Sequence, residues 1–402
     1  EICACLVGSE MCIRDRSLMI LVSCTEKRLE PITESLGMPT VPTEISVEPV
    51  SGGVVISYRV PDVEDILGVK AVYSLADGKQ REVISSYYNN QVRIMGYDDM
   101  EEHEAVLYTV NRAMELSEPV TVSFTPLESS ISKVSKSMKI IRDFGGAQYS
   151  WTNDERESIT MEMLTNDESG NMVAMKIMTT ASKTGTYALR GYDIDPRWFA
   201  AVVRDNYGNV SDTIYPRNES GEKMQIAPLY EQKLNKSAMR VMILNNDTPF
   251  NDFGGSNANM IDDNLETFGH SSNGTMPASF TIDLGEPVKL SRVVLYQRNN
   301  EPYGWGNPRV FEVYYSGSEP ERSGDWGQWT KLLDCEVIKP SGMPIGTNTD
   351  EDMEALKEGH DFSFDVDQEP VRYLRFKFIK VWTSSTFCHP AEFTFYGDPN
   401  VE

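Results

Sequence analysis

Two segments in the last third of the chain combine large aromatic side chains with groups that form hydrogen bonds. Residues 298–307 are too rich in glycine and proline for a strand, and residues 381–390 form a second such segment. The side chains of interest are Arg298, Tyr303, Trp305, Trp382, Phe387 and His389. An aromatic face stacks on the apolar side of a sugar ring, while arginine or histidine fixes the hydroxyls. This composition predicts a carbohydrate site, although each aromatic could equally anchor a loop or fill the core.

Strand-like segments with alternating apolar residues surround these two loops. They lie at residues 278–285, 293–298, 307–316, 371–378 and 391–397, after a polar turn at 260–268. Taken in order, they resemble the discoidin or coagulation-factor type C domain over residues 238–398. The resemblance implies a galactose-binding-like jelly-roll sandwich, a fold also used as a carbohydrate-binding module. Its ligand site would lie in loops at one end, where both aromatic loops converge on His270.

The same resemblance implies a structural calcium ion. Calcium ligands in that family come from a D-x-N-x-x-T loop and a glutamate near the last strand. These positions fall on Asp262, Asn264, Thr267 and Glu392. Hard oxygen ligands of this kind suit Ca²⁺. The alternative is that residues 262–264 form an Asx turn without a metal.

The N-terminal half has the pattern of two smaller β-domains. Period-two strands are predicted at 54–60, 68–74, 105–111 and 120–124, with a hairpin turn at Asp77 and Gly78. Residues 42–127 resemble a fibronectin type III domain, and residues 128–232 resemble a second immunoglobulin- or fibronectin-like domain. The expected fold class is therefore all-β, with two such sandwiches followed by the galactose-binding-like one.

The first residues have a separate origin from the domains. Residues 1–16 back-translate to a sequence that resembles a sequencing-library adaptor, so they are excluded from the fold prediction. Residues 17–24 are typical of a truncated lipoprotein signal peptide, which ends in a lipobox at Cys24. Lipid on this thiol would hold the protein on a membrane. Residues 25–41 are polar, contain proline and suit a tether.

Charge narrows the range of partners. The 402 residues carry 61 acidic and 37 basic side chains, for a net charge of −24. Phosphate contacts need clustered lysine and arginine, so this balance argues against nucleic-acid binding. It also opposes adsorption to an anionic membrane, which leaves a lipid anchor as the expected membrane attachment.

Motifs for catalysis are missing from the sequence. It contains four histidines and no HExxH, G-x-S-x-G or CxxC motif, so we expect no enzyme. The arrangement of domains resembles Bacteroidetes surface lipoproteins encoded with polysaccharide-uptake systems. That resemblance implies an outer-membrane lipoprotein, on the periplasmic or the exposed face, that captures glycan for a transporter or glycoside hydrolase partner. The alternative is a protein–protein adaptor or accessory subunit of such a complex.

Overall fold

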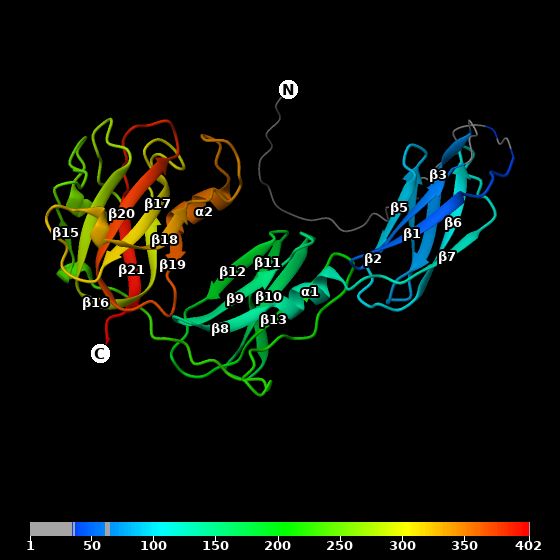
Figure 1. The fold of residues 1–402 in the computed structure, drawn as a ribbon, viewed down its shortest axis with the longest axis horizontal. Coiled ribbons are helices and arrows are strands. Elements are labelled where there is room, and N and C mark those ends of the chain that lie inside the picture. Colours follow the sequence, from blue (N-terminus) through cyan, green and yellow to red (C-terminus); the bar gives the residue numbers. More distant parts are fainter. Residues whose placement is uncertain (1–33, 35–36, 61–64, 402) are drawn as a thin grey trace, which may run out of the picture. The chain divides into compact units, whose positions relative to one another are not determined.

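The computed structural model describes residues 34, 37–60 and 65–401 (Figure 1). The chain divides into two compact units, Glu1–Ser129 and Ser130–Glu402. Cys24, the signal peptide and most of the tether lie outside the described residues. Within the described part of the chain, no helix is long and apolar enough to cross a membrane.

The first unit is a sandwich of two antiparallel sheets. One sheet has the order β1-β2-β5 and the other the order β4-β3-β6-β7. The strands are β1 (Thr43–Val50), β2 (Gly53–Arg59), β3 (Ile66–Ser74), β4 (Gln80–Ser86), β5 (Gln91–Met95), β6 (His103–Asn111) and β7 (Val120–Phe124). Alternate residues of these strands face inward, as period-two patterning requires, and form one core. The predicted turn between β3 and β4 is present: Gly78 adopts φ +71° and its N–H donates to the Leu75 carbonyl.

The second unit begins with a pair of three-stranded sheets. Their orders are β12-β9-β8 and β11-β10-β13. The elements are α1 (Ser130–Ser137), β8 (Lys139–Asp143), β9 (Gly146–Thr152), β10 (Ile159–Asn166), β11 (Met172–Thr180), β12 (Thr184–Leu189) and β13 (Phe199–Arg204). Met161 and Met163 on β10 are fully buried against Tyr149 and Phe199, so these flexible side chains fill the core.

The rest of the second unit is the C-terminal domain. Its strands are β14 (Gln232–Lys233), β15 (Arg240–Met242), β16 (Ala278–Tyr296), β17 (Pro308–Ser316), β18 (Thr330–Glu336), β19 (His360–Ser363), β20 (Val371–Val381) and β21 (Glu392–Asp398). Its helices are η1 (Lys236–Ala238), η2 (Asn257–Ile261), η3 (Trp326–Gln328) and α2 (Asp350–Glu358). The strands follow the order β14-β21-β16-β20-β17-β18, with β15 and β19 paired to β16.

The long strand β16 connects the two layers of this domain. Its first half pairs with β15 and β20, and its second half pairs with β19 and β21. The register shifts between Asp283 and Val288, where Gly285 adopts φ +92°. A residue with a Cβ is strained at that φ, so glycine lets one strand serve both layers.

Aromatic residues fill the space between these layers. The Phe280 and Phe393 rings lie within 6.2 Å of each other and of both Phe376 and Phe378, centroid to centroid, and all four side chains are almost completely buried. The expected all-β chain of sandwich domains is therefore confirmed. Cys335 and Cys388 are both buried and unpaired.

Candidate functional site

Loops of the C-terminal domain enclose a depression of about 360 Å³. Five of the seven residues predicted to bind carbohydrate line it. Its full lining is Phe253, His270, Asn273, Arg298, Glu301, Trp305, Phe387 and His389. These residues come from three stretches far apart in sequence: the segment before β16, the loop between β16 and β17, and the loop between β20 and β21.

Backbone hydrogen bonds hold the three stretches together. The Ser271 N–H donates to the Cys388 carbonyl over 2.9 Å, and the His389 N–H donates to the Gly306 carbonyl over 2.8 Å. Space at Gly306 is tight, because an added Cβ would lie 2.6 Å from the Phe387 ring and 2.8 Å from the His389 ring. The site is therefore built before a ligand arrives, which lowers the entropy lost on binding.

The wall of the depression is aromatic. The His270 and Phe387 rings stack with centroids 4.8 Å apart, and Phe253 lies 4.7 Å from His270. Trp305 and Phe253 stand at its rim, with 59% and 65% of their surface exposed. Both have positive φ, a strained conformation for residues with a Cβ that persists only where the surroundings hold it. Large rings held exposed in this way are available to stack on a ligand.

A cation lies beside this aromatic wall. The Arg298 guanidinium lies 3.8 Å from the centroid of the Phe268 ring. Within the described residues, the guanidinium forms no hydrogen bond or ion pair. Its N–H groups are therefore free to donate to oxygen atoms of a ligand.

An acceptor without a donor also belongs to the lining, on Glu301. The Gly306 N–H donates to His389 Nε2 over 3.0 Å, and since a backbone N–H can only donate, that nitrogen carries a lone pair. Glu301 Oε2 lies 3.1 Å from the same nitrogen and gains no proton from it, because burial lowers the pKa of His389 to about 3. This buried carboxylate oxygen has no hydrogen-bond donor among the described residues. Glu301 lines the depression with its side chain 25% exposed, so a shift of this side chain would bring the oxygen within reach of a ligand hydroxyl.

Two of the predicted sugar-binding residues, Tyr303 and Trp382, lie in the interior instead. Tyr303 is fully buried, and its hydroxyl donates to the Asp352 carbonyl over 3.0 Å. Trp382 is 9% exposed and packs edge-to-face on Tyr303, with centroids 5.2 Å apart. These two rings anchor the loops from beneath and do not reach the depression, which corrects their assignment.

Three lining residues were missed from the sequence. Phe253 follows β15 in a glycine-rich turn, Asn273 belongs to the segment around His270, and Glu301 lies inside a loop already singled out. An exposed aromatic in a glycine-rich turn is a usable signal for Phe253. Nothing in the sequence distinguishes Glu301 from the many surface carboxylates.

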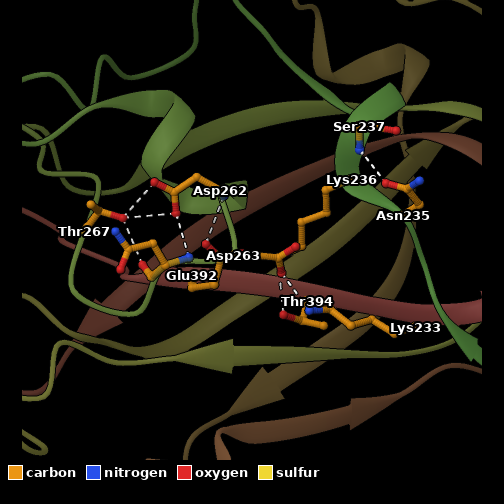
Figure 2. Close-up of polar contacts among 10 residues, drawn as sticks. Lys233, Asn235, Lys236, Ser237, Asp262, Asp263, Thr267, Glu392 and Thr394 are labelled. Atoms are coloured by element: carbon orange, nitrogen blue, oxygen red, sulfur yellow. Dashed lines mark hydrogen bonds and ion pairs between the residues drawn. The ribbon is translucent and has the colours of Figure 1, made fainter.

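The residues expected to bind calcium have other partners (Figure 2). The Asp262 carboxylate accepts hydrogen bonds from the Thr267 hydroxyl at 2.8 and 3.0 Å and from the Asn264 N–H at 2.9 Å. Glu392 Oε2 accepts the Asp262 N–H over 3.1 Å, and Glu392 Oε1 pairs with the Lys236 ammonium. Lys236 Nζ also lies 2.8 Å from Asp263 Oδ1.

This donor set does not fit Ca²⁺. A calcium ion needs six to eight oxygen ligands that converge on one point. Here the Asp262 carboxylate closes its own loop as an Asx turn, and an ammonium lies against Glu392. No group of three or more His, Cys, Asp or Glu side chains in the described residues is arranged to hold a metal.

The buried histidine His360 should make the free energy of unfolding of this domain depend on pH. Burial lowers the pKa of His360 to about 4, below its ordinary 6.5. The unfolded chain then binds a proton between pH 6.5 and 4 that the folded chain does not, so this group lowers stability as the pH falls through that range. The loss at pH 5 is about 2 kcal/mol.

The measurement compares wild type with His360→Gln by urea unfolding at pH 7.5 and 5.0. The comparison is necessary because burial raises the pKa of Glu392 to about 7, which acts in the opposite direction. We expect the stability of wild type relative to the variant to fall by about 2 kcal/mol between the two pH values. A difference that does not change with pH contradicts the prediction.

Family models match three segments of the chain, one in each of the three β-domains. Three family models match, each described as a domain of unknown function, at residues 39–126, 127–237 and 258–397. A search of curated proteins found no match.

Several solved structures are similar to parts of the chain. A SusE-like protein is 29% identical, covering 67% of this chain and 99% of its own, with a TM-score of 0.43. A carbohydrate-binding module of a family 31 glycoside hydrolase from Clostridium perfringens is 19% identical, covering 41% of this chain and 95% of its own, with a TM-score of 0.31. The C-terminal domain of a chitobiase from Bacteroides fragilis is 20% identical, covering 41% of this chain and 97% of its own, with a TM-score of 0.30.

Proposed function

We propose that the chain is a non-catalytic glycan-binding protein whose C-terminal domain holds sugar in the depression. The observation that carries the proposal is the meeting of three ligand-seeking groups at one preformed site. Trp305 offers an exposed ring, Arg298 offers unused donors, and Glu301 offers a buried oxygen without a donor. A pyranose has an apolar face for the first and hydroxyls for the other two.

The shape of the site favours a terminal or exposed sugar unit. The depression of about 360 Å³ lies at the small end of the range for small-molecule pockets, which suits one or a few sugar units better than a long segment of polymer. Its rim residues Phe253 and Trp305 are more than half exposed, so further sugar units would extend past them into solvent. This geometry suits capture of a polymer from outside.

The cellular setting is part of the same proposal. Acylation at Cys24, which lies outside the described residues, would place the protein on the bacterial outer membrane. Glycan captured there would pass to a transporter or glycoside hydrolase partner. Metabolic labelling with a palmitate analogue tests the anchor, because Cys24→Ala removes the label if this thiol carries the lipid.

A glycan array with the full chain tests the proposed binding. We expect wild type to bind a limited set of glycans, and Trp305→Ala to bind the best of them about tenfold more weakly, because a stacking surface is lost. The matched control is Trp382→Phe, which alters a buried ring of the same loop cluster and should retain binding. If wild type binds no glycan on the array, the proposal is wrong.

A second candidate function is protein–protein docking. Strand β11 is at the edge of its sheet and exposes Met175 and Ile177, at 52% and 59%. Unpaired strand edges with apolar side chains are recognised by β-augmentation. An array without glycan hits, together with recovery of a partner that Ile177→Lys no longer binds, would favour this adaptor function.

A further inference from the structure

Lys236 occupies an unusual position for a lysine. It begins the short helix η1, and its side chain is only 5% exposed. Its ammonium contacts the carboxylates of Glu392 and Asp263 and lies 3.3 Å from the Thr394 hydroxyl. Figure 2 shows the side chain reaching across to Glu392 on β21. A lysine is almost never buried unless paired in this way.

The backbone around Lys236 positions its ammonium group next to Glu392. The Asn235 side chain caps η1 by accepting the Ser237 N–H over 2.9 Å, which fixes where the helix begins. The Leu234 N–H donates to the Phe395 carbonyl over 2.9 Å, and β14 pairs with β21. The backbone that precedes Lys236 is therefore held against the strand that carries Glu392.

Glu392 needs a cation. Its side chain is 1% exposed, and a buried carboxylate is costly unless it is paired and hydrogen-bonded. One oxygen is satisfied by the Asp262 N–H, which ties the D-x-N-x-x-T loop to the sheet. The other oxygen faces the Lys236 ammonium. A calcium ion bound to Glu392 would have to take the place of this ammonium.

We propose that the Lys236 ammonium is the built-in replacement for a divalent cation, so that the C-terminal domain holds its loop in place without calcium. The Lys236 ammonium supplies the positive charge that faces Glu392, and it shares Asp263 with Lys233. The Asp262 carboxylate accepts the Thr267 hydroxyl. The inference goes beyond glycan binding, since it concerns what stabilises the loop whether or not a ligand binds.

Calorimetry of the full chain at pH 8 tests the proposal in wild type. Scans are run in 5 mM EDTA and in 5 mM CaCl₂. This calcium concentration is about an order of magnitude above the dissociation constants of weak extracellular calcium sites. We expect every transition to coincide between the two solutions. A rise of several degrees in calcium would overturn the proposal, because a bound cation stabilises the folded state that holds it.

Variants then test the charge itself. In EDTA, Lys236→Ala should lower the melting temperature of one transition by about 10 °C, because it leaves Glu392 buried without a counter-ion. Adding Glu392→Gln to Lys236→Ala removes the orphaned charge and should recover part of that loss. The control is Lys233→Ala, since Lys233 pairs with the same Asp263 but is 49% exposed.

Each of these results either supports or contradicts the counter-ion role of Lys236. Lys236→Ala melting within 2 °C of wild type, or no recovery in the double variant, would contradict the counter-ion role. Lys233→Ala falling as far as Lys236→Ala would contradict it too, because burial would then not distinguish the two lysines. If Lys236→Ala fails to fold, the comparison of wild type in EDTA and calcium still decides whether a metal is used.

Discussion

Arg375→Met is expected to destabilise the C-terminal domain by about 3–5 kcal/mol, which is the usual cost of breaking one side of a buried ion pair. Arg375 on β20 is fully buried. Its guanidinium donates to Asp247 Oδ1 at 2.8 and 3.1 Å, to Asn246 Oδ1 at 2.7 Å and to the Gly324 carbonyl at 2.6 Å. Methionine fills most of the volume and removes all four bonds, so Asp247 keeps its charge without its partner.

Hydrogen exchange of the β20 amides in the full chain measures this loss, because exchange reports the local free energy of opening. Asp247→Asn keeps one side-chain oxygen that can accept from Arg375, whose bonds to Asn246 and Gly324 also remain, so it should cost less. Arg309→Met is the control, since Arg309 pairs with Glu336 on the exposed side of β17. A loss below 1 kcal/mol for Arg375→Met would contradict the prediction.

Arg375 also marks what the sequence does not reveal about the fold. The strand containing it is predicted by its alternation, but Arg375 lies on the face opposite the core residues Leu374 and Phe376 and is nevertheless fully buried, because Trp326 and loop residues cover it. Its partners Asp247 and Gly324 lie in loops far away in sequence. Periodicity assigns a residue to a face of a strand, whereas the groups that satisfy a buried charge depend on loops whose course has no periodic signal.

The candidate site shows the same division between composition and placement. Residues 298–307 and 381–390 are singled out by their aromatic and polar content, and the structure brings side chains of both loops to one depression. The composition does not predict which rings face solvent: Trp305 is exposed, whereas Tyr303, two residues earlier, is fully buried. Both have positive φ in an irregular loop, so no period-two rule assigns their sides.

The calcium prediction depended on a short donor motif. Asp262, Asn264 and Thr267 do lie close together, but they bond to one another as an Asx turn does. The residue that alters the chemistry is Lys236, which precedes the motif and reaches Glu392 only through the fold. A motif describes the potential ligands, and it carries no information about a cation supplied from another part of the chain.

Arg298→Ala is expected to weaken glycan binding 10- to 100-fold, the larger of the two effects predicted for the site. A hydrogen bond that involves a charged group contributes about 1.5–3 kcal/mol, and each 1.4 kcal/mol is a factor of ten in affinity. The Arg298 guanidinium stacks on the Phe268 ring and has no hydrogen-bond acceptor among the described residues, so its N–H groups are available for the ligand. The loss should appear in the dissociation rate more than in the association rate.

Titration calorimetry with the best array ligand measures the effect, and two variants separate its causes. Arg298→Lys keeps the charge but not the flat, forked donor group, and should recover only part of the affinity. Glu301→Gln keeps the size of its side chain but puts an N–H₂ group on the terminal carbon, so it should also weaken binding if a ligand hydroxyl donates to Oε2. Equal affinity of wild type and Arg298→Ala would place the ligand elsewhere. Equal affinity of Arg298→Lys and wild type would mean that the site uses Arg298 for its charge and not for directed hydrogen bonds.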